Sequence, residues 1–409
     1  MNFTTIKMRL FHYQIAIELL TIYLKVAAVF GNEKAKKSIE GKEKWQKDLS
    51  NLSSEKKTFW IHCASHGEAI MANELVRKIL NEKNNQVVMS FFSPSGYDNY
   101  SFEDANFHKF HLPFDKKRKA KKIVDFINPR ILIFVKYDLW LNLINECHKK
   151  NIPSIVFSSK FRKSHWYFNI FGTSAKKVLQ TMNLILTADH LSKELLKENG
   201  FSNVKFSGDT RFDSLNEVKS NLVLDIRLPC IILGSSWEKE ESITAEIIKA
   251  IDNVHWIIAP HEIKEKEILR TKKLFGNNAE LYSKIDLKKP IPKVLIIDQI
   301  GILANLYNYS DIAFVGGGFS GKLHNILEAA SKGNFLLFGP NIKNYPEADL
   351  MLKEKIAKVI RNSKEMKNAI VDLLENKDTL EKKKRKAIQI IKENKGATEI
   401  VWNEIQKMI

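Results

Sequence analysis

Short apolar runs alternate with longer amphipathic segments along most of this chain. Runs with the length and composition of buried strands lie at residues 58–65, 86–92, 130–135, 155–157, 183–187, 230–233, 256–259, 294–297, 312–315 and 335–338. Between most of these runs, apolar residues recur at the spacing of helices. Strands that alternate with helices are typical of a parallel sheet covered by helices on both faces. The pattern therefore predicts an α/β protein.

The alternation stops and restarts once, which predicts two domains. We expect residues 58–213 to form an N-terminal Rossmann-like domain and residues 229–409 to form a C-terminal one that includes the terminal helices. Residues 214–228 are predicted to be the linker between them. In two doubly wound domains that face a cleft, ligands bind at the carboxyl ends of the strands. Polar residues that follow a strand are therefore the first candidates for a functional site.

Residues 1–30 contain the most apolar stretch of the chain, and its pattern is helical. Polar residues at spacings of four, three and four fall on one narrow stripe of this helix. They are Gln14, Glu18, Thr21 and Lys25. A charge at the centre of a bilayer costs ~3 kcal/mol, so two charges disfavour a membrane-spanning helix. We expect a membrane-associated amphipathic helix in the interface, or one docked in a groove, followed by a charged helix and linker at 31–57.

A secretory signal peptide is the alternative interpretation of the N-terminal stretch. Lys7 and Arg9 precede the apolar run, as a signal peptide requires. Glu18 lies inside the apolar region and weakens this alternative, because a signal peptide has an uninterrupted apolar segment.

The composition favours an anionic partner. The 409 residues carry a formal net charge of +18, and nucleic acid, anionic lipid or a phosphorylated substrate would each be attracted to it. Basic runs lie at 116–122 and 382–386, for which a solvated surface is the simpler account. The three cysteines are too few and too scattered for a disulfide framework or a metal site, which indicates a reducing, cytoplasmic setting.

The most informative stretch runs from residue 311 to residue 340 and has the pattern strand, glycine loop, helix, strand. The glycines at 316–318 allow a ligand to approach the backbone closely. The N–H groups of the next helix, predicted over 324–331, favour an anion. Asn325 and Glu328 share one face of that helix. The stretch predicts a nucleotide-sugar site with phosphate on the loop and ribose on Glu328, and a tight structural turn with a capping carboxylate is the alternative.

A second candidate site is the sequence Ser65-His66-Gly67-Glu68, where the first predicted strand gives way to a helix predicted from about Ala69. Functional groups of open α/β sheets favour this location. The helix N-terminus stabilises a carboxylate, so Glu68 is expected to be ionised and able to accept a proton. His66 is the other candidate base. A glutamate that only serves the helix dipole, and a structural histidine, are the alternatives.

Seven segments occur in one order along the chain: HCASHGE, LPFD, NPRILIFVKYDLWLN, GDTRFD, GSSWEKEE, APHE and VGGGFSGKLHNILEAASKGNFLLFGPN. Their order and spacing resemble the 3-deoxy-D-manno-octulosonic acid (Kdo) transferases of lipopolysaccharide synthesis, the lipid A Kdo transferase family. The resemblance covers nearly the whole chain. It implies a GT-B fold and a glycosyltransferase that moves Kdo from CMP-Kdo to a 6′-hydroxyl of the lipid A precursor. It also implies a location at the cytoplasmic face of the inner membrane.

The resemblance assigns roles to the residues that match the family's motifs. Glu68 matches the glutamate of S-x-G-E, the proposed general base. The positions implied in donor or substrate binding are Arg211, Ser235, Ser236, His261, Gly317, Gly318, Asn325 and Glu328. Possible acceptor-site positions are Ser65, His66 and Asp138. No D-x-D sequence occurs, so neither a metal nor another cofactor is expected.

The chain departs from the family pattern at a few positions. His66 stands where relatives usually have a small or apolar residue, and Ala329 where proline is usual. Lys136-Tyr137-Asp138 replaces a more acidic version, which leaves the role of Asp138 open. None of these departures removes a group with an obvious chemical role.

The implied reaction inverts the anomeric centre. Glu68 takes the proton of the acceptor hydroxyl as the new bond forms, while the glycine loop, helix N–H groups and Arg211 hold the charge of departing CMP. Two alternatives stay open: a GT-B enzyme that uses a UDP-sugar, and a non-enzymatic basic protein that binds membrane or nucleic acid. Because no helix-turn-helix, zinc-finger or RRM signature accompanies the basic runs, a nucleic-acid partner is not expected.

Overall fold

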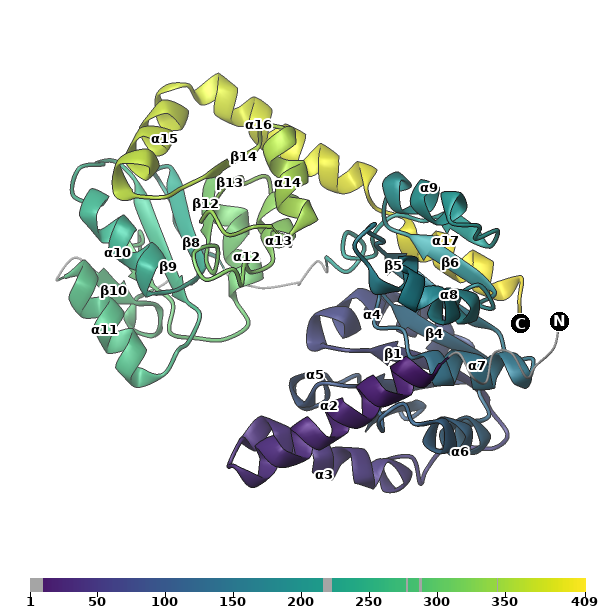
Figure 1. The fold of residues 1–409 in the computed structure, drawn as a ribbon. Helices are drawn as coiled ribbons and strands as arrows, with labels where there is room; N and C mark the ends of the chain where they lie inside the picture. Colours follow the sequence, from purple (N-terminus) through teal and green to yellow (C-terminus); the bar gives the residue numbers. More distant parts are fainter. Residues whose placement is uncertain (1–9, 216–222, 277–278, 287–288, 344) are drawn as a thin grey trace. The chain divides into compact units, whose positions relative to one another are not determined.

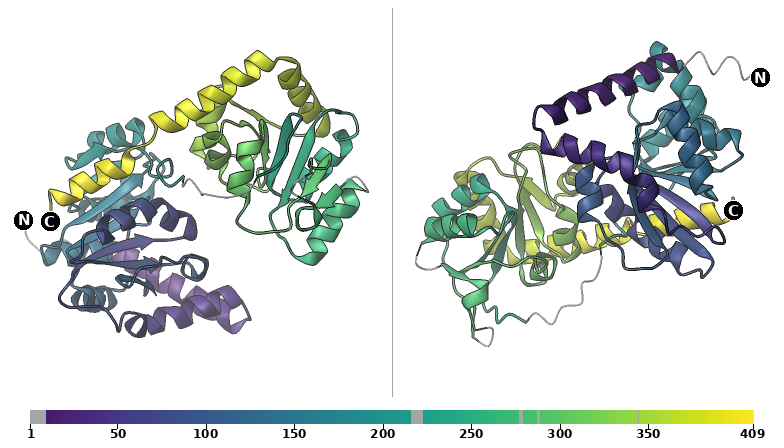
Figure 2. Two further views of the ribbon diagram at one scale, coloured as in Figure 1. Left: turned by 180° about the vertical axis from the view of Figure 1, so that it is seen from behind. Right: turned by 90° about the horizontal axis from the view of Figure 1, so that it is seen from below.

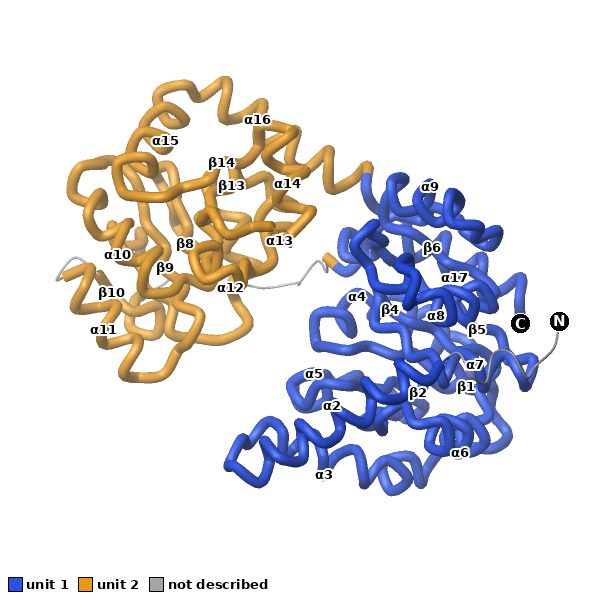
Figure 3. Tube along the Cα trace, in the orientation of Figure 1, with its two compact units in different colours: residues 1–214, 394–409 blue, residues 215–393 orange. Residues whose placement is uncertain are grey.

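We describe the protein from a computed structural model, which describes residues 10–215, 223–276, 279–286, 289–343 and 345–409. The chain divides into two compact units, shown in different colours in Figure 3. Unit 1 comprises residues 1–214 and 394–409, and unit 2 comprises residues 215–393. Each unit has its own sheet and its own apolar core, and each is described by itself.

Within the described residues, unit 1 is built on one seven-stranded parallel sheet, in the order β3-β2-β1-β4-β5-β6-β7 (Figure 1). Its strands are β1 (Lys57–Cys63), β2 (Asn85–Phe91), β3 (Phe107–His111), β4 (Ile131–Val135), β5 (Ser154–Ser159), β6 (Leu184–Thr187) and β7 (Val204–Phe206). The chain builds outward from β1 through β2 to β3 and then returns to β4 on the other side of β1. The carboxyl ends of β1 and β4 therefore form a topological switch point, the place where open α/β sheets bind ligands.

Helices cover both faces of the unit 1 sheet. They are α2 (Phe11–Val29), α3 (Glu33–Asp48), α4 (His66–Leu80), α5 (Pro94–Asn99), α6 (Lys117–Ile127), α7 (Leu141–Lys149), α8 (Thr173–Leu179), α9 (His190–Glu198) and α17 (Ala397–Gln406). Apolar residues of α6, α7 and α8 fill one face, and those of α4 and α17 fill the other. The fully buried strands explain why the sequence shows continuous apolar runs rather than alternation.

The N-terminal helix α2 pairs with α3, and the two lie side by side in the views of Figures 1 and 2. Leu10 and Ile17 are buried in the core of unit 1. Within the predicted polar stripe, Thr21 is buried against the protein, and its hydroxyl donates to the Ile17 carbonyl. Glu18 forms an exposed ion pair with Lys116. One face of the helix thus packs on unit 1. This agrees with the predicted arrangement in which the helix is docked on the protein.

Large apolar side chains line the other face of α2 and its end. The side chains of Phe11, Ile15, Leu19, Ile22, Val26, Val29 and Phe30 are all more than two-fifths exposed. Their spacing of four and three residues is the spacing of one helical face. No helix among the residues described is both long enough and apolar enough to cross a membrane.

In the part of the chain that the structure describes, unit 2 also has a seven-stranded parallel sheet, ordered β10-β11-β9-β8-β12-β13-β14. Its strands are β8 (Cys230–Ser236), β9 (His255–Pro260), β10 (Ala279–Leu281), β11 (Val294–Ile296), β12 (Ile312–Val315), β13 (Phe335–Phe338) and β14 (Ala357–Val359). Its helices are α10 (Glu238–Ile247), α11 (Glu265–Phe275), α12 (Leu303–Leu306), α13 (Ile326–Ser331), α14 (Pro346–Lys353), α15 (Ser363–Glu375) and α16 (Lys377–Glu393). Here the switch point lies between β8 and β12.

The C-terminal segment corrects the predicted domain boundary at 229–409, because residues 394–409 belong to unit 1. Val401, Trp402 and Ile405 of α17 are buried against the sheet of unit 1. The Asp213 carboxylate accepts hydrogen bonds of 2.6 Å from the N–H groups of Gly396 and Thr398 at the start of this helix. Burial of the apolar face and capping of the helix thus hold the end of the chain on unit 1.

Part of the predicted linker 214–228 is structured. Residues 216–222 lie outside the described residues, but Leu224 is buried and Asp225 pairs with Pro290 in an isolated bridge. These contacts attach the second half of the predicted linker to unit 2. The predicted helix and linker at 31–57 contains α3, whose Asn32 side chain caps its first turn.

Candidate active site

Glu68 lies at the switch point of unit 1. Helix α4 begins at His66, three residues earlier than predicted, so Glu68 is in its first turn just after β1. The Glu68 side chain is buried, and its Oε2 accepts a hydrogen bond from the N–H of Ala64 in the turn between strand and helix. The strand end and the helix start thus hold the carboxylate in one place.

The surroundings of Glu68 shift the pKa of its carboxyl. Burial raises the pKa of its carboxyl, and this effect outweighs Lys136 and the Ala64 N–H, both of which lower it. Loss of water around a buried carboxylate disfavours its charged form, and here it is the largest influence on the pKa. A carboxylate with a raised pKa is a better proton acceptor, because it binds the transferred proton more tightly.

Ser65 and His66 lie just before Glu68 in the chain. Among the described residues, neither side chain forms a hydrogen bond with the Glu68 carboxylate. Ser65 is the N-cap residue of α4, although its hydroxyl makes no capping hydrogen bond. His66 packs edge-on against Tyr100, and its Nδ1 has no partner among the described residues. Burial lowers the pKa of the imidazole, so His66 is predominantly neutral at pH 7.

Asp138 follows β4 and occupies the other side of the same switch point. Its Oδ2 lies 3.2 Å from Nε2 of His62, a buried residue of β1 that the sequence analysis did not single out. Lys136, between β4 and Asp138, has a φ of +64°. Such a backbone costs of order 1–3 kcal/mol outside glycine and occurs where neighbouring structure enforces it, often at functional sites. The side chain of Asp138 is one-third exposed, so it is open to a ligand.

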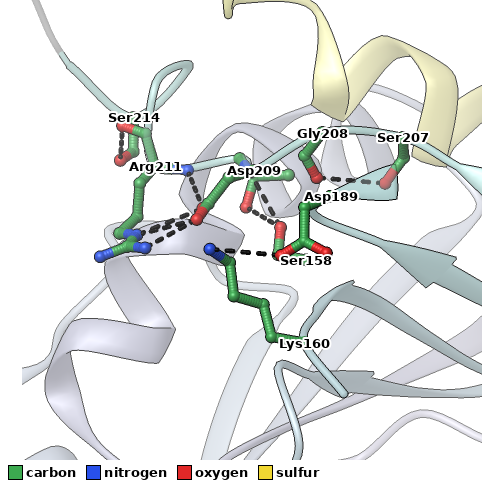
Figure 4. A network of polar contacts seen from close by, with 9 residues as sticks. Ser158, Lys160, Asp189, Ser207, Gly208, Asp209, Arg211 and Ser214 are labelled. Carbon is green, nitrogen blue, oxygen red and sulfur yellow. Dashed lines mark hydrogen bonds and ion pairs between the residues drawn. The ribbon is translucent and has the colours of Figure 1, made fainter. Parts of the chain in front are cut away.

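Arg211 belongs to unit 1, not to the unit that carries the other residues expected to bind the donor. Figure 4 shows its guanidinium against the carboxylate of Asp209, with the Arg211 NH2 group 2.7 Å from Oδ2. Burial opposes the charge of Asp209, but the charge and hydrogen bonds of Arg211 prevail and lower the pKa of this carboxyl. Asp209 thereby fixes the orientation of Arg211 near the carboxyl end of the sheet.

Unit 2 places its glycine loop at its own switch point, between β8 and β12. A Cβ at Gly316 would lie 2.1 Å from the Ser235 carbonyl oxygen, and one at Gly318 would lie 2.4 Å from the Gly339 nitrogen. Glycine is therefore required at both positions by close backbone packing, and Gly317 additionally has a φ of +86°. Ser235, at the end of β8, has a φ of +51°, so it is a second strained residue at a strand end.

Two buried glutamates of α10 form hydrogen bonds with groups that were predicted to bind the ligand. Glu240 Oε1 accepts a hydrogen bond of 2.9 Å from the Gly317 N–H, so this N–H does not face a phosphate as expected. The Ser236 hydroxyl donates to Glu241 Oε1 at 2.9 Å and is therefore engaged inside the unit. Glu241 in turn accepts from Arg270. The two glutamates stabilise the loops that surround the candidate ligand site.

Asn325 and Glu328 lie together, as predicted, although α13 begins two residues later than the predicted helix. Asn325 is the N-cap residue, and its Oδ1 accepts a hydrogen bond from the Leu327 N–H. Its Nδ2 donates to Glu328 Oε1 at 2.9 Å. The pKa of Glu328 is raised, because burial raises it by more than the hydrogen bond from Asn325 lowers it. The cap explains the late start of the helix, because an N-cap residue has non-helical backbone angles.

Three aromatic rings gather at the carboxyl edge of the unit 2 sheet. The Trp237 ring stacks on His261 with 4.4 Å between centroids, and His261 lies 4.4 Å from His324. The Trp237 Nε1–H also donates to Nε2 of His324 at 3.2 Å. Burial, and to a lesser extent His261, lower the pKa of His324 to about 4, so this imidazole is neutral at pH 7. The sequence analysis named His261 as a site residue but did not assign a role to Trp237.

The structure thus gathers the predicted residues into two groups. Unit 1 holds Ser65, His66, Glu68, Asp138 and Arg211, and unit 2 holds Ser235, Ser236, His261, Gly317, Gly318, Asn325 and Glu328. Each group lies at the carboxyl edge of its own sheet. No group of three His, Cys, Asp or Glu side chains among the described residues has the arrangement of a metal site.

Comparison with known families shows which family most of unit 1 matches. The family model described as 3-deoxy-D-manno-octulosonic-acid transferase (kdotransferase) matches residues 41–214. Residues 41–214 belong to the Kdo transferase family. The match contains Glu68, Asp138 and Arg211.

Relatives extend the similarity to the Kdo transferases over most of the chain. It is 28% identical to the 3-deoxy-D-manno-octulosonic acid transferase of Haemophilus influenzae, over 83% of this chain and 84% of that protein. A similar enzyme of Chlamydia trachomatis is 25% identical over 86% and 85%. A bifunctional glycosyltransferase/methyltransferase of Fusobacterium nucleatum is 28% identical over 87% of this chain, which spans 58% of that protein's length. These relationships place the chain among the glycosyltransferases and confirm the recognition made from its motifs.

Solved structures confirm the fold. MurG of Acinetobacter baumannii aligns with a TM-score of 0.58 at 14% identity, over 86% of this chain and 99% of that one. A UDP-GlcNAc 2-epimerase of Neisseria meningitidis aligns with a TM-score of 0.57 at 14% identity, over 86% and 100%. The two parallel-sheet units of this Kdo transferase relative therefore have the GT-B fold that the sequence motifs implied.

Proposed function

We propose that this protein transfers Kdo from CMP-Kdo to the 6′-hydroxyl of a lipid A precursor, with inversion at the anomeric carbon. The single observation that carries the proposal is Glu68, a buried carboxylate with a raised pKa at the switch point of a Kdo transferase family domain. The names of the Haemophilus and Chlamydia relatives state that those proteins are Kdo transferases, which supports Kdo as the transferred group.

Glu68 acts as the general base in this proposal. An alcohol is a poor nucleophile, so a carboxylate within hydrogen-bond reach must take its proton as the new bond forms. Only the deprotonated Glu68 can do so. Because burial raises the pKa of this group, activity falls as the pH drops through a value above the usual ~4.3 of a glutamate.

Unit 2 would bind the nucleotide of the donor. Glu328 can accept hydrogen bonds from ribose hydroxyls, and Asn325 fixes the direction in which its carboxylate points. The glycine loop follows β12 at the same edge of the sheet, and the donor phosphate is proposed to lie beside it. The stacked rings of Trp237, His261 and His324 offer an aromatic surface at the same edge of the sheet. An aromatic surface suits a nucleobase or the apolar face of a sugar.

The acceptor is proposed to reach Glu68 from the cytoplasmic face of the inner membrane. The exposed apolar face of α2 supports this part of the proposal, because such a face can bury itself in the headgroup region of a bilayer. Basic side chains of α6 are exposed in the same unit, and each basic group near an anionic membrane adds ~1 kcal/mol of attraction. In this arrangement the helix lies on the membrane and does not span it.

The decisive experiment incubates the full chain with CMP-Kdo and a tetraacylated lipid A precursor and identifies products by mass spectrometry. The expected product has gained one or more Kdo residues at the 6′-hydroxyl, with CMP released. CMP is expected to inhibit, and UDP or DNA is not. Inhibition by UDP but not CMP, with no Kdo product, would point to the alternative of a UDP-sugar donor.

A further inference from the structure

Asp115 is a buried carboxylate that caps helix α7. Its Oδ2 accepts a hydrogen bond of 2.8 Å from the Asn142 N–H, and its Oδ1 accepts one of 3.1 Å from the Leu143 N–H. Both N–H groups belong to the first turn of the helix, where the helix itself offers them no acceptor. Burial raises the pKa of Asp115 to about 6, although the hydrogen bonds that it accepts oppose the rise. The group is therefore mainly ionised at pH 7 and can accept all of these bonds.

Tyr13 of α2 completes this cap from a distant part of the chain. Its hydroxyl donates to Asp115 Oδ2 at 2.6 Å and accepts from the Leu141 N–H at 3.4 Å. Each proton in this arrangement has one donor and one acceptor, because Asp115 is the anion and Tyr13 keeps its hydroxyl proton. The N–H groups of the first three residues of α7 are thus held by two side chains that lie 102 residues apart.

Helix α7 begins three residues after Asp138, the carboxylate on the other side of the switch point from Glu68. The segment between them has little freedom of its own, because Lys136 has a φ of +64° and Trp140 is buried. A shift of the start of α7 would therefore move Asp138. The two sites are also close in space. Burial is the largest cause of the raised pKa of Tyr13 and Asp115 is the next, but the charge of Asp138 contributes as well.

We propose that Tyr13 is a positioning residue of the acceptor site, which fixes Asp138 through Asp115 and the first turn of α7. Helix α2 is then part of the acceptor site as well as a contact for the membrane. The inference rests on the proposed function, in which the acceptor hydroxyl is bound beside Glu68. Tyr13 acts through these groups and not on the substrate.

A second contact attaches α2 to the same loop but leads to a different helix. Glu18 forms an ion pair of 2.6 Å with Lys116, the residue that follows Asp115. Lys116 is the N-cap residue of α6. Glu18→Gln therefore weakens the docking of α2 and leaves the cap of α7 in place, whereas Tyr13→Phe removes a hydroxyl from that cap.

Hydrogen exchange of the full chain tests the cap without any assay of activity. In Tyr13→Phe the Leu141 N–H loses its acceptor and Asp115 loses a donor, so the amides of residues 141–143 should exchange several-fold faster than in wild type. Tyr23→Phe is the matched control, because it makes the same change at an exposed position of the same helix. It should leave the exchange as in wild type. Unchanged exchange in Tyr13→Phe, or an equal increase in both variants, overturns the proposal.

Kinetics with a soluble, deacylated acceptor separate positioning from membrane contact, because such an acceptor needs no bilayer. In Tyr13→Phe we expect its KM to rise ~3–10-fold, less than the ~10²-fold that a 1 Å misplacement can cost. The value of kcat and the affinity for CMP should change little, because the Ala64 N–H holds Glu68 independently of α7. Tyr23→Phe and Glu18→Gln should both keep the wild-type KM.

A wild-type KM in Tyr13→Phe would show that the hydroxyl only stabilises the fold, and it overturns the proposal. An equal rise of KM in Glu18→Gln does so too, because the effect would then come from the docking of α2 as a whole. If wild type transfers Kdo to no acceptor, the proposed function fails and the acceptor site with it. The exchange result decides separately whether Tyr13 holds the start of α7.

Discussion

Glu240 accepts a hydrogen bond from the backbone N–H of Gly317, 77 residues further along the chain. The same carboxylate accepts from the Trp237 N–H through its other oxygen. One buried side chain thereby connects the loop after β8 to the glycine loop after β12. The two loops on either side of the unit 2 switch point are therefore held by a single carboxylate.

Glu240→Ala is expected to weaken CMP binding and to destabilise unit 2. Removing one partner leaves buried N–H groups unsatisfied, which costs ~1–3 kcal/mol. Calorimetry with CMP and denaturant unfolding measure the two effects. Glu246→Ala, at an exposed position of the same helix, is the control and should change neither. Wild-type CMP affinity in Glu240→Ala would mean that the glycine loop does not depend on this bond.

Glu68→Gln is expected to abolish Kdo transfer and leave CMP binding unchanged. The amide has the shape of the carboxylate but cannot accept the proton, and a general base contributes ~10²–10⁴-fold to the rate. Turnover is measured by release of CMP from CMP-Kdo in the presence of acceptor. The control is Glu74→Gln, which alters a carboxylate of the same helix that pairs with Arg77 at the surface. Turnover near wild type in Glu68→Gln would shift attention to His66 as the base.

Glu328→Ala is expected to lower the affinity for CMP. Loss of a charged acceptor to a ribose hydroxyl costs ~1.5–3 kcal/mol. The measurement is calorimetric titration with CMP, again with Glu246→Ala as the control. Asn325→Ala should give a smaller loss in the same direction, because it removes the group that orients Glu328. If CMP binds both variants as tightly as wild type, the nucleotide does not lie against α13.

Chelation is expected to leave the reaction unaffected. The chain has no D-x-D sequence, and the proposed mechanism places the departing charge on protein groups. Transfer is therefore measured before and after EDTA treatment, with added Mg²⁺ as the second arm. A strict requirement for Mg²⁺ would contradict the mechanism and direct attention to carboxylates near the donor phosphate.

Replacing Leu19 and Ile22 of α2 by serine is expected to reduce binding to vesicles that contain anionic lipid. Both side chains are more than half exposed, so the substitutions should cost little stability. Deleting residues 1–30 is a less clean test, because Leu10 and Ile17 belong to the core of unit 1. Flotation with vesicles measures the binding. Leu191→Ser, at an apolar and still more exposed position on α9, is the control. Undiminished flotation of the α2 variant would assign membrane binding to another surface.

Local patterns along the chain predicted the strands that lie inside the sheets. Strands β12 and β13 begin and end at the predicted residues, and Glu68 lies where the first strand gives way to its helix. Such strands are covered on both faces, so each is a continuous apolar run that the sequence displays by itself. The edge strands β3, β7, β10 and β14 were not predicted. They are short or carry polar residues, because an edge strand is only partly covered.

Only the tertiary structure decided which polar groups meet. His62 contacts Asp138 and Trp140 across separations of 76 and 78 residues, and no periodicity in the sequence records such a pairing. The packing of α17 on unit 1 is a second example. Composition alone does not show whether its apolar face covers unit 1 or unit 2. The raised pKa of Glu68 is a third example, because burial depends on everything packed around the carboxyl. The sequence by itself determined the strands inside the sheets and the family motifs, because these are local patterns. The mutual packing of the elements determined the edge strands and the burial, orientation and pKa shifts of the groups that the motifs carry.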